Sequence, residues 1–410
     1  MASILVTGAS GYIGQFVVDA ALRRGPSVAR VAGTCATAPL HDDDGGDSSS
    51  AWPCPMYRVR LGDGDPTSDT PSTAASTAPT ASTAPTASTP STVSTATTAS
   101  FAAVRACLED FRPDVVVHCA AVASLGACEA DPAAAMRANA DPALLAALRE
   151  LCPDCALIFA STDQVFDGLG PLPYGPDARS NPVNAYGRSK AAFECAMGAA
   201  GDAGNADGAG DAGATDTADG TGRTGENPAR LLPGKGTIKG TIVRLSNVYG
   251  PRSPFSDPPV GKFVQWLDEQ LADDDGSGTS SGGGGGGDDG EGRDCQVKLF
   301  SDELRCYVHV EDVADLLVAL ALKAVEERQE GGDGGGGDGN GDCSDGTSGS
   351  NDGGQGGVGA ECAHNAGRPR IIHCGGPEAL SRVQVGEMVL EARGYRRKAI
   401  KMVKSRHHER

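Results

Sequence analysis

The sequence predicts an α/β protein built on a doubly wound parallel sheet, with a small C-terminal substrate lobe and four long disordered inserts. Two observations support this prediction. Short apolar segments of strand length alternate with helical segments of ten or more residues, which is the pattern of parallel strands joined by crossover helices. The chain also opens with an apolar strand, a glycine-rich turn and an amphipathic helix.

Four low-complexity stretches interrupt the 410-residue chain, at 65–100, 201–230, 273–294 and 331–363. The first is rich in Pro, Ser, Thr and Ala and the others in Gly, Asp and Ser, compositions that cannot bury apolar surface. Each stretch separates two patterned segments, and the cost of closing a loop grows only logarithmically with its length. We therefore interpret all four as surface loops of one fold, whose remainder is long enough for a single sizeable core.

Nearly all of the formal net charge of −19 comes from acidic residues in these stretches. The remainder is close to neutral, so we expect neither nucleic acid nor an anionic membrane as a partner. No apolar run approaches the ~20 residues needed to span a bilayer. The 13 cysteines show no repeated spacing and no leader precedes the first strand, which predicts reduced thiols and a cytoplasmic location. We interpret the pair Cys152 and Cys155 as structural and expect no metal site.

The predicted elements of the sheet follow in chain order. Strands are rich in β-branched and apolar residues, and helices carry apolar residues three or four positions apart. We predict strands at 3–7, 28–34, 115–119, 156–161 and 241–245, and helices at 12–24, 101–111, 133–151, 185–199 and 261–271.

The later elements are predicted to build the smaller lobe over the carboxyl edge of the sheet. They are the strands VKLF, CYVHV and RIIHC and the helices 310–324 and 382–392. We place the dinucleotide-binding domain at residues 1–250 and the lobe at 251–410, with one late strand returning to the sheet.

Three glycines, Gly8, Gly11 and Gly14, lie three residues apart between the first strand and the first helix. Glycine permits a tight turn and lets the backbone approach a pyrophosphate, whose charge is met by amide groups at the helix N-terminus. The position of this motif between a strand and a helix predicts a dinucleotide site.

The end of the second strand predicts the choice of cofactor. In NAD-binding proteins an acidic residue there binds the ribose 2′-hydroxyl. Here Thr34 occupies this region, and no acid follows before Asp42. A small hydroxyl side chain accepts a 2′-phosphate that an acid would repel, so we expect NADP(H), with NAD(H) as the alternative.

A second group of residues predicts acid–base chemistry. Tyr186 and Lys190 are four residues apart, so they lie on one face of a helix. A neighbouring ammonium stabilises a phenolate, and lowering the tyrosine pKa by two to three units requires about 3 to 4 kcal/mol. Thr162 ends a predicted strand at the edge where parallel sheets bind ligands, so its hydroxyl is placed to hold a substrate carbonyl.

Several motifs together resemble the extended short-chain dehydrogenase/reductases, specifically the dTDP-4-dehydrorhamnose reductase family, which includes the regulatory β subunit of methionine adenosyltransferase. They are TGASGYIG, DVVVHCAAVASLGACEADP, STDQVFDG, NAYGRSK, RLSNVYGP and DELRCYVHVEDVADLL. The resemblance covers nearly all of the sequence outside the four inserts. It implies a Rossmann domain that binds NADP(H) or NAD(H).

The resemblance also implies roles for individual residues. Cofactor contacts would come from Ser10, Gly11, Tyr12 and Ile13 along the phosphates and from Cys119, Ala120 and Ala121 beside the adenosine. Thr162, Tyr186 and Lys190 would form the catalytic triad, and Asn139 would support a water-linked proton relay. The substrate would be bound by Val122, Thr162, Asp163, Gln164, Asn247 and Arg305, the last as a ligand of the diphosphate or, alternatively, as a surface ion pair.

Two features depart from the family pattern. Relatives end the third strand with an Asp near the adenine, whereas this chain has Arg60 there and Asp63 slightly later. The chain also stops soon after the last predicted helix, so we expect either a truncated sequence or an incomplete substrate pocket.

The leading hypothesis is a reductase that transfers hydride to the 4-keto group of a deoxysugar nucleotide, with Tyr186 as the acid. The alternatives are a non-catalytic regulatory subunit that binds a partner enzyme, and a nucleotide-sugar epimerase or dehydratase. A homodimer or a complex with a partner enzyme is compatible with each.

Overall fold

The computed structural model describes ten parts of the chain. They are residues 1–36, 52–62, 96–199 apart from 171 and 176, 238–255, 263–264, 266–267, 270, 297–332, 368–394 and 400–404. Asp63 and most of the four predicted inserts lie outside the described residues.

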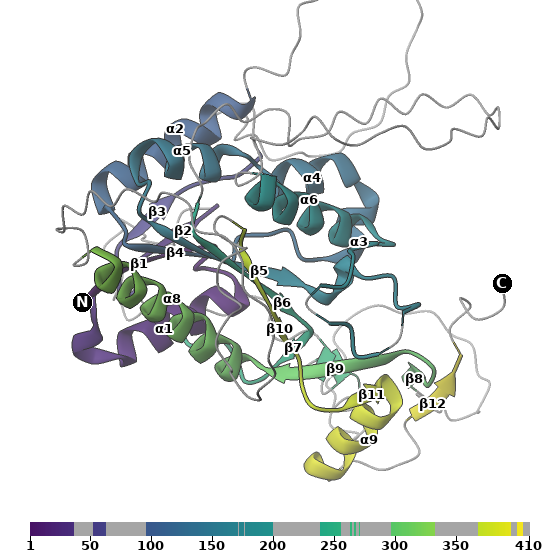
Figure 1. The fold of residues 1–410 in the computed structure, drawn as a ribbon. Helices are drawn as coiled ribbons and strands as arrows, with labels where there is room; N and C mark the ends of the chain where they lie inside the picture. The colour runs from purple at the N-terminus through teal and green to yellow at the C-terminus, as the bar shows by residue number, and fades with distance from the viewer. Residues whose placement is uncertain are drawn as a thin grey trace, which may run out of the picture.

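The centre of the fold is a parallel sheet of seven described strands in the order β10-β6-β5-β4-β1-β2-β3 (Figure 1). The order reverses direction at β1, as in doubly wound sheets, so the predicted fold class is confirmed. The strands are β1 (Ala2–Thr7), β2 (Val28–Cys35), β3 (Met56–Arg58), β4 (Val115–His118), β5 (Ala156–Thr162), β6 (Gly240–Leu245) and β10 (Arg370–Cys374).

Helices cover both faces of this sheet, because successive side chains of each buried strand point to opposite faces. Ile4 and Val6 of β1 pack in one core cluster with α1 (Tyr12–Arg23) and α8 (Val310–Gly332). Leu5 packs in the other cluster with three helices, α2 (Ala96–Phe111), α5 (Ala143–Leu151) and α6 (Ala185–Ala199).

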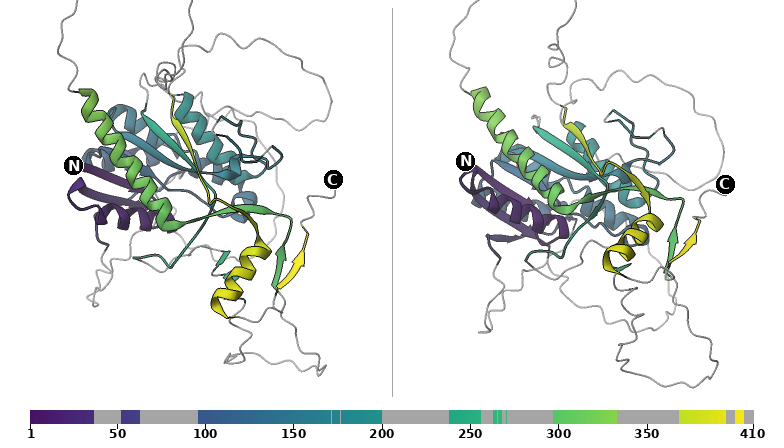
Figure 2. Two further views of the ribbon diagram at one scale, coloured as in Figure 1. Left: turned by 60° about the horizontal axis from the view of Figure 1, so that its bottom comes forward. Right: turned by 90° about the horizontal axis from the view of Figure 1, so that it is seen from below.

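Helix α8 lies on the main sheet, so its predicted placement in the smaller lobe is wrong. Val313, Leu317 and Ala321 recur every four residues and are fully buried in the cluster shared with α1 and β1. Figure 2 shows α8 running beside α1 across one face of the sheet. A helix with one apolar stripe can cover any apolar surface, and the sequence alone does not say which one it covers.

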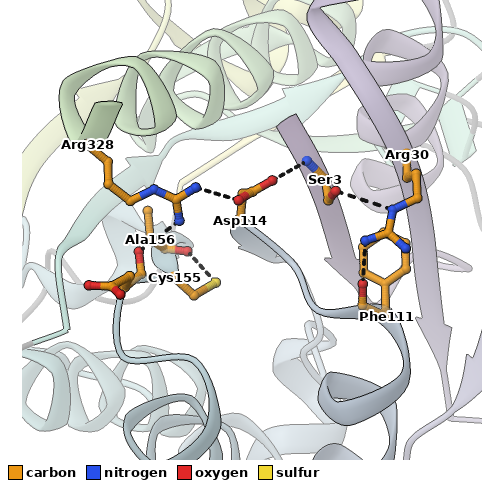
Figure 3. A network of polar contacts seen from close by, with 8 residues as sticks. Ser3, Arg30, Phe111, Asp114, Cys155, Ala156 and Arg328 are labelled. Atoms are coloured by element: carbon orange, nitrogen blue, oxygen red, sulfur yellow. Dashed lines mark hydrogen bonds and ion pairs between the residues drawn. The ribbon is translucent and has the colours of Figure 1, made fainter. Parts of the chain in front are cut away.

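A polar network joins the far end of α8 to the amino edge of the sheet (Figure 3). Arg328 forms an ion pair with Asp114, and the other carboxylate oxygen of Asp114 accepts a hydrogen bond from the Ser3 amide at 2.9 Å. Arg30 of β2 donates to the Phe111 carbonyl at 2.8 Å and to the Ser3 hydroxyl at 3.4 Å. These contacts connect β1, β2, the start of β4 and α8 at the amino ends of the strands.

The boundaries of three predicted helices differ from the structure by more than one residue. The helix expected at 133–151 is two helices, α4 (Pro132–Asn139) and α5, because Pro142 cannot continue the hydrogen bonding of α4. Helix α2 begins at Ala96, inside the first predicted insert, and helix α8 reaches two residues into the fourth. A short helix, α3 (Leu125–Ala130), was not predicted.

The later part of the chain also forms two small sheets beside the main one. One pairs β7 (Asn247–Tyr249) and β11 (Ala379–Ser381) with β9 (Leu304–His309), and the other pairs β8 (Val297–Phe300) with β12 (Ile400–Val403). Helix α9 (Arg382–Arg393) packs with β8 in a separate apolar cluster. The described residues of the predicted helix 261–271 are helical. The division into two domains at residue 250 stays a prediction.

No helix in the described parts of the chain is long and apolar enough to cross a bilayer.

Candidate active site

The glycine-rich turn between β1 and α1 is shaped by close backbone packing. Gly8 has a φ of +67°, and a Cβ there would lie 2.7 Å from the Ala120 amide nitrogen. A Cβ on Gly14 would lie 2.8 Å from the Ala9 Cα, whereas one on Gly11 would meet only the Gly8 carbonyl among the described residues. Gly8 and Gly14 therefore close the turn. Gly11, at the start of α1, leaves open the side on which a pyrophosphate would bind.

Tyr12 connects this turn to the segment after β7. Its hydroxyl donates to the Pro251 carbonyl at 3.0 Å, and its ring meets Phe16 edge-on. Burial, with a smaller contribution from Glu311, raises the pKa of Tyr12 to about 12. Of its predicted neighbours along the phosphates, Ile13 packs against the core and the Ser10 carbonyl accepts from the side-chain nitrogen of Gln15 at 3.1 Å.

Thr34 supports the same turn from the end of β2. Its hydroxyl accepts from the Gly8 amide at 3.3 Å and its carbonyl accepts from the Ala9 amide at 2.9 Å. The side chain is 4% exposed, so the hydroxyl faces the turn. On the next strand the exposed Arg58 is paired with Cys35, which places a cation beside the end of β2.

The residues after β4 border the turn on its other side. The Cys119 amide donates to the Thr7 carbonyl at 3.1 Å, and Ala120 lies against Gly8. Ala121 and Val122 are exposed. The predicted adenosine-side segment therefore lies next to the turn, while Asp63 falls outside the described residues.

The structure brings the three predicted catalytic residues together. Tyr186 and Lys190 lie one turn apart on α6, and Thr162 lies close enough to Tyr186 for its side chain to lower the tyrosine pKa. Gly187 permits this approach, because a Cβ there would lie 2.9 Å from the carbonyl carbon of Gln164. Asn184 caps the helix by accepting from the Gly187 amide at 2.7 Å.

The electrostatics of Tyr186 differ from the prediction that Lys190 lowers its pKa. Burial raises the pKa of Tyr186, the Asp163 carboxylate raises it further, and the Thr162 side chain opposes the rise. Burial lowers the pKa of Lys190 to about 8, against the opposing effects of Cys119 and Glu194. Tyr186 is thus protonated at neutral pH and is available as a proton donor.

Asn139 has a positioning role in this geometry. Its side-chain oxygen accepts from the Val122 amide at 2.7 Å, and its nitrogen donates to the Val122 carbonyl at 3.1 Å and to the Ser189 hydroxyl at 2.9 Å. The side chain is 1% exposed. It therefore joins the segment after β4 to α6, and the water-linked relay stays a prediction.

Asp163 and Arg305, from distant segments, lie within electrostatic range of each other beside Tyr186. Asp163 accepts from Thr162 at 3.4 Å and from the Gln164 side chain at 3.2 Å. Burial raises the pKa of Asp163, and the positive charge of Arg305 on β9 opposes that rise. Arg305 therefore lies within electrostatic range of Asp163, and its role toward a substrate stays a prediction.

Tyr307 also lies near Arg305, and the sequence did not single it out. It is the register partner of Asn247, and burial raises its pKa while the Asn247 side chain opposes the rise. Arg305 and Tyr307 are two apart on β9, so they share one face of the strand. The two-residue spacing in the sequence could have indicated that Tyr307 lies on the same face of the strand as Arg305.

Glu194 and Arg244, which the sequence did not single out, form a buried ion pair one helical turn after Lys190 on α6. Arg244 donates to both carboxylate oxygens of Glu194, at 2.7 Å through Nη2 and 3.2 Å through Nε, and Ser161 donates to the same carboxylate. Glu194 continues the four-residue spacing of Tyr186 and Lys190 along α6, which was a readable signal.

The fold and the site define a Rossmann-fold protein with a Tyr–Lys pair and a glycine-rich dinucleotide turn at the same edge of its parallel sheet. The profile of the NAD dependent epimerase/dehydratase family matches residues 4–333. The chain belongs to this family.

Curated relatives match over shorter segments. A dTDP-4-keto-6-deoxy-D-glucose reductase of Streptomyces niveus is 41% identical over 100 residues, which are 23% of this chain and 33% of the relative. The methionine adenosyltransferase 2 subunit beta of Danio rerio is 43% identical over 88 residues, 22% of this chain and 26% of the relative. The matches thus span about a third or less of these relatives' length.

Solved structures share the fold. A UDP-glucose-4-epimerase of Stenotrophomonas maltophila with bound NAD superposes with a TM-score of 0.58 at 15% identity, covering 99% of this chain and 87% of that one. The UDP-glucose 4-epimerase of Thermus thermophilus, in complex with NAD, gives a TM-score of 0.54 at 21% identity, covering 98% and 86%.

Proposed function

We propose that this protein is an NADP(H)-dependent reductase of a 4-keto-deoxysugar nucleotide. The observation that carries the proposal is the approach of Tyr186 to Thr162 at the carboxyl end of β5, with Lys190 one helical turn away and the glycine turn at the same edge of the parallel sheet. The match to the Streptomyces niveus reductase supports the choice of a keto-sugar nucleotide as substrate.

The residues present fit a dinucleotide and divide the work of reduction. The glycine turn and the first amides of α1 would hold its pyrophosphate, and Lys190 would bind its nicotinamide ribose. When bound, the cofactor supplies hydride to the carbonyl carbon. The Thr162 hydroxyl orients the carbonyl oxygen, and Tyr186, kept protonated by burial, donates its proton to that oxygen.

On the substrate side, Arg305 is proposed to bind the diphosphate. Its planar guanidinium matches phosphate oxygens, and its charge acts on the neighbouring Asp163 carboxylate. Tyr307 and Asn247, which are register partners on adjacent strands, are proposed to line the same side.

NADP(H) is proposed over NAD(H) from the end of β2. At this position Thr34 has a neutral hydroxyl, which accepts from the Gly8 amide, whereas an acidic side chain would repel a 2′-phosphate. Arg58 places a positive charge on the adjacent strand. An arginine near this position accommodates the 2′-phosphate in related folds.

A second candidate function is a regulatory subunit that binds a dinucleotide and a partner enzyme. The match to the methionine adenosyltransferase 2 subunit beta, at 43% identity, favours it. Because the two candidates share the Rossmann turn, cofactor binding does not separate them and turnover does.

The test offers a dTDP-4-keto-6-deoxy sugar to the purified full chain and follows NADPH and NADH oxidation, with cofactor binding measured by fluorescence in the same samples. The reductase predicts turnover that Tyr186→Phe abolishes while binding persists. Tyr57→Phe, which removes a hydroxyl bound to Asp110 on α2, is the matched control and should retain turnover. Binding without turnover in the unmodified protein would refute the reductase and favour the regulatory subunit.

A further inference from the structure

Lys190 lies over the face of an aromatic ring. Its ammonium nitrogen is 4.1 Å from the centroid of the Phe159 ring. Lys190 is 1% exposed and Phe159 is fully buried. A desolvated ammonium over a ring face is attracted by the negative potential of the π-system, and the attraction is strongest where water is excluded.

The groups nearest to this contact are neutral, and the face of the Phe159 ring presents negative potential directly to the Lys190 ammonium. His118 on β4 is stacked on Phe159 at 5.4 Å and bonded through Nδ1 to the Thr7 hydroxyl at 2.6 Å. Burial and the Lys190 charge lower the pKa of His118 to about 3, so the imidazole is neutral. Burial raises the pKa of Cys119 to about 12, so it is a neutral thiol.

The remaining charged group, Glu194, lies one turn along α6 from Lys190. Its carboxylate is held by Arg244 and Ser161, and the Glu194 and Arg244 side chains are 7% and 5% exposed. The carboxylate raises the pKa of Lys190, but it is shared with the arginine and the serine hydroxyl. On its other side along the helix Lys190 has Tyr186, whose phenol is protonated because burial raises its pKa.

We propose that Phe159 is a positioning residue for Lys190. The face of the Phe159 ring holds the buried Lys190 ammonium in its charged form and in place beside Tyr186. A buried lysine loses its proton more readily than an exposed one. The ring counteracts that loss, so that Lys190 remains a cation at neutral pH, where the proposed reaction needs it. This role rests on the proposed function for its consequence in turnover, but the proton affinity of Lys190 is independent of any reaction.

The experiment is an NMR titration of the Lys190 ammonium in full-length protein labelled with ¹³C and ¹⁵N lysine, with Lys190→Met to assign its signal. Phenylalanine 159 is replaced by mono-, di- and trifluorophenylalanine, which keep the ring shape and progressively remove its negative potential. Phe159→Leu removes the ring. Phe193→Leu is the matched control, because Phe193 is 1% exposed and its ring centroid lies 4.5 Å from that of Phe159 within the same cluster.

We expect the pKa of Lys190 to fall stepwise with each fluorine and by about one unit, a tenfold loss of proton affinity, in Phe159→Leu. Phe193→Leu should leave it unchanged. An unchanged Lys190 pKa across the fluorinated series, or an equal fall in Phe193→Leu, would overturn the proposal. If the unmodified protein shows no turnover, the proposed reductase fails while the titration still decides the role of Phe159.

Discussion

Replacing Gly187 by alanine should disable the site without removing any functional group. Gly187 follows Tyr186 on α6 and lies against the backbone of Gln164, immediately after Thr162 and Asp163. A Cβ at Gly187 would lie 2.9 Å from the Gln164 carbonyl carbon and closer still to its oxygen, whereas ordinary contact begins at 3.4 Å. Both atoms belong to the backbone, so no side-chain rotation relieves the overlap.

The size of the effect follows from this geometry. Relieving the overlap requires α6 to move about 1 Å from the end of β5, and overpacking of this kind costs about 1–3 kcal/mol of unfolding free energy. The same movement separates Tyr186 from Thr162. Misplacing reacting groups by about 1 Å lowers turnover by about 100-fold.

The assay combines steady-state turnover with urea unfolding of the full chain, for Gly187→Ala and for the control Gly198→Ala. Gly198 is on the same helix, and a Cβ there meets nothing within 4 Å. The control should keep full turnover and gain about 0.5–1 kcal/mol, because alanine favours the helix. Full turnover in Gly187→Ala would refute the argument that this glycine sets the distance between α6 and β5.

Three more predictions follow from buried and charged contacts. Thr34→Asp should shift the ratio of kcat/KM values from NADPH toward NADH, and an unaltered ratio would exclude Thr34 from cofactor selection. Glu194→Gln should lower the unfolding free energy by about 3–5 kcal/mol, because it leaves Arg244 buried without its partner, and a loss under 1 kcal/mol would contradict this. Burial alone would raise the pKa of Asp114, but hydrogen bonds and the Arg328 ion pair outweigh it and lower the pKa. Asp114→Asn should therefore cost about 1–2 kcal/mol in urea unfolding above the unfolded carboxyl pKa of about 4, a difference that disappears as the pH falls through the lowered folded value. A cost independent of pH would contradict that assignment.

The predictions from sequence succeeded where the signal is local. The helix of Tyr186 and Lys190 has the predicted bounds, since its residues and their spacing lie within one continuous segment. The predictions failed where the signal depends on distant partners. The position of α8 depends on its contacts with α1, and its own apolar stripe does not encode them.

Residue types and spacings thus determined the sheet strands, the glycine turn and the four-residue repeat that aligns Tyr186 with Lys190. Only the tertiary structure decided their electrostatics. Burial raises the pKa of Tyr186, and the burial of a side chain is a property of everything packed around it. The electrostatic effect of Arg305 on Asp163 and the contact of Lys190 with the ring of Phe159 likewise depend on how strands and helices from separate segments pack together.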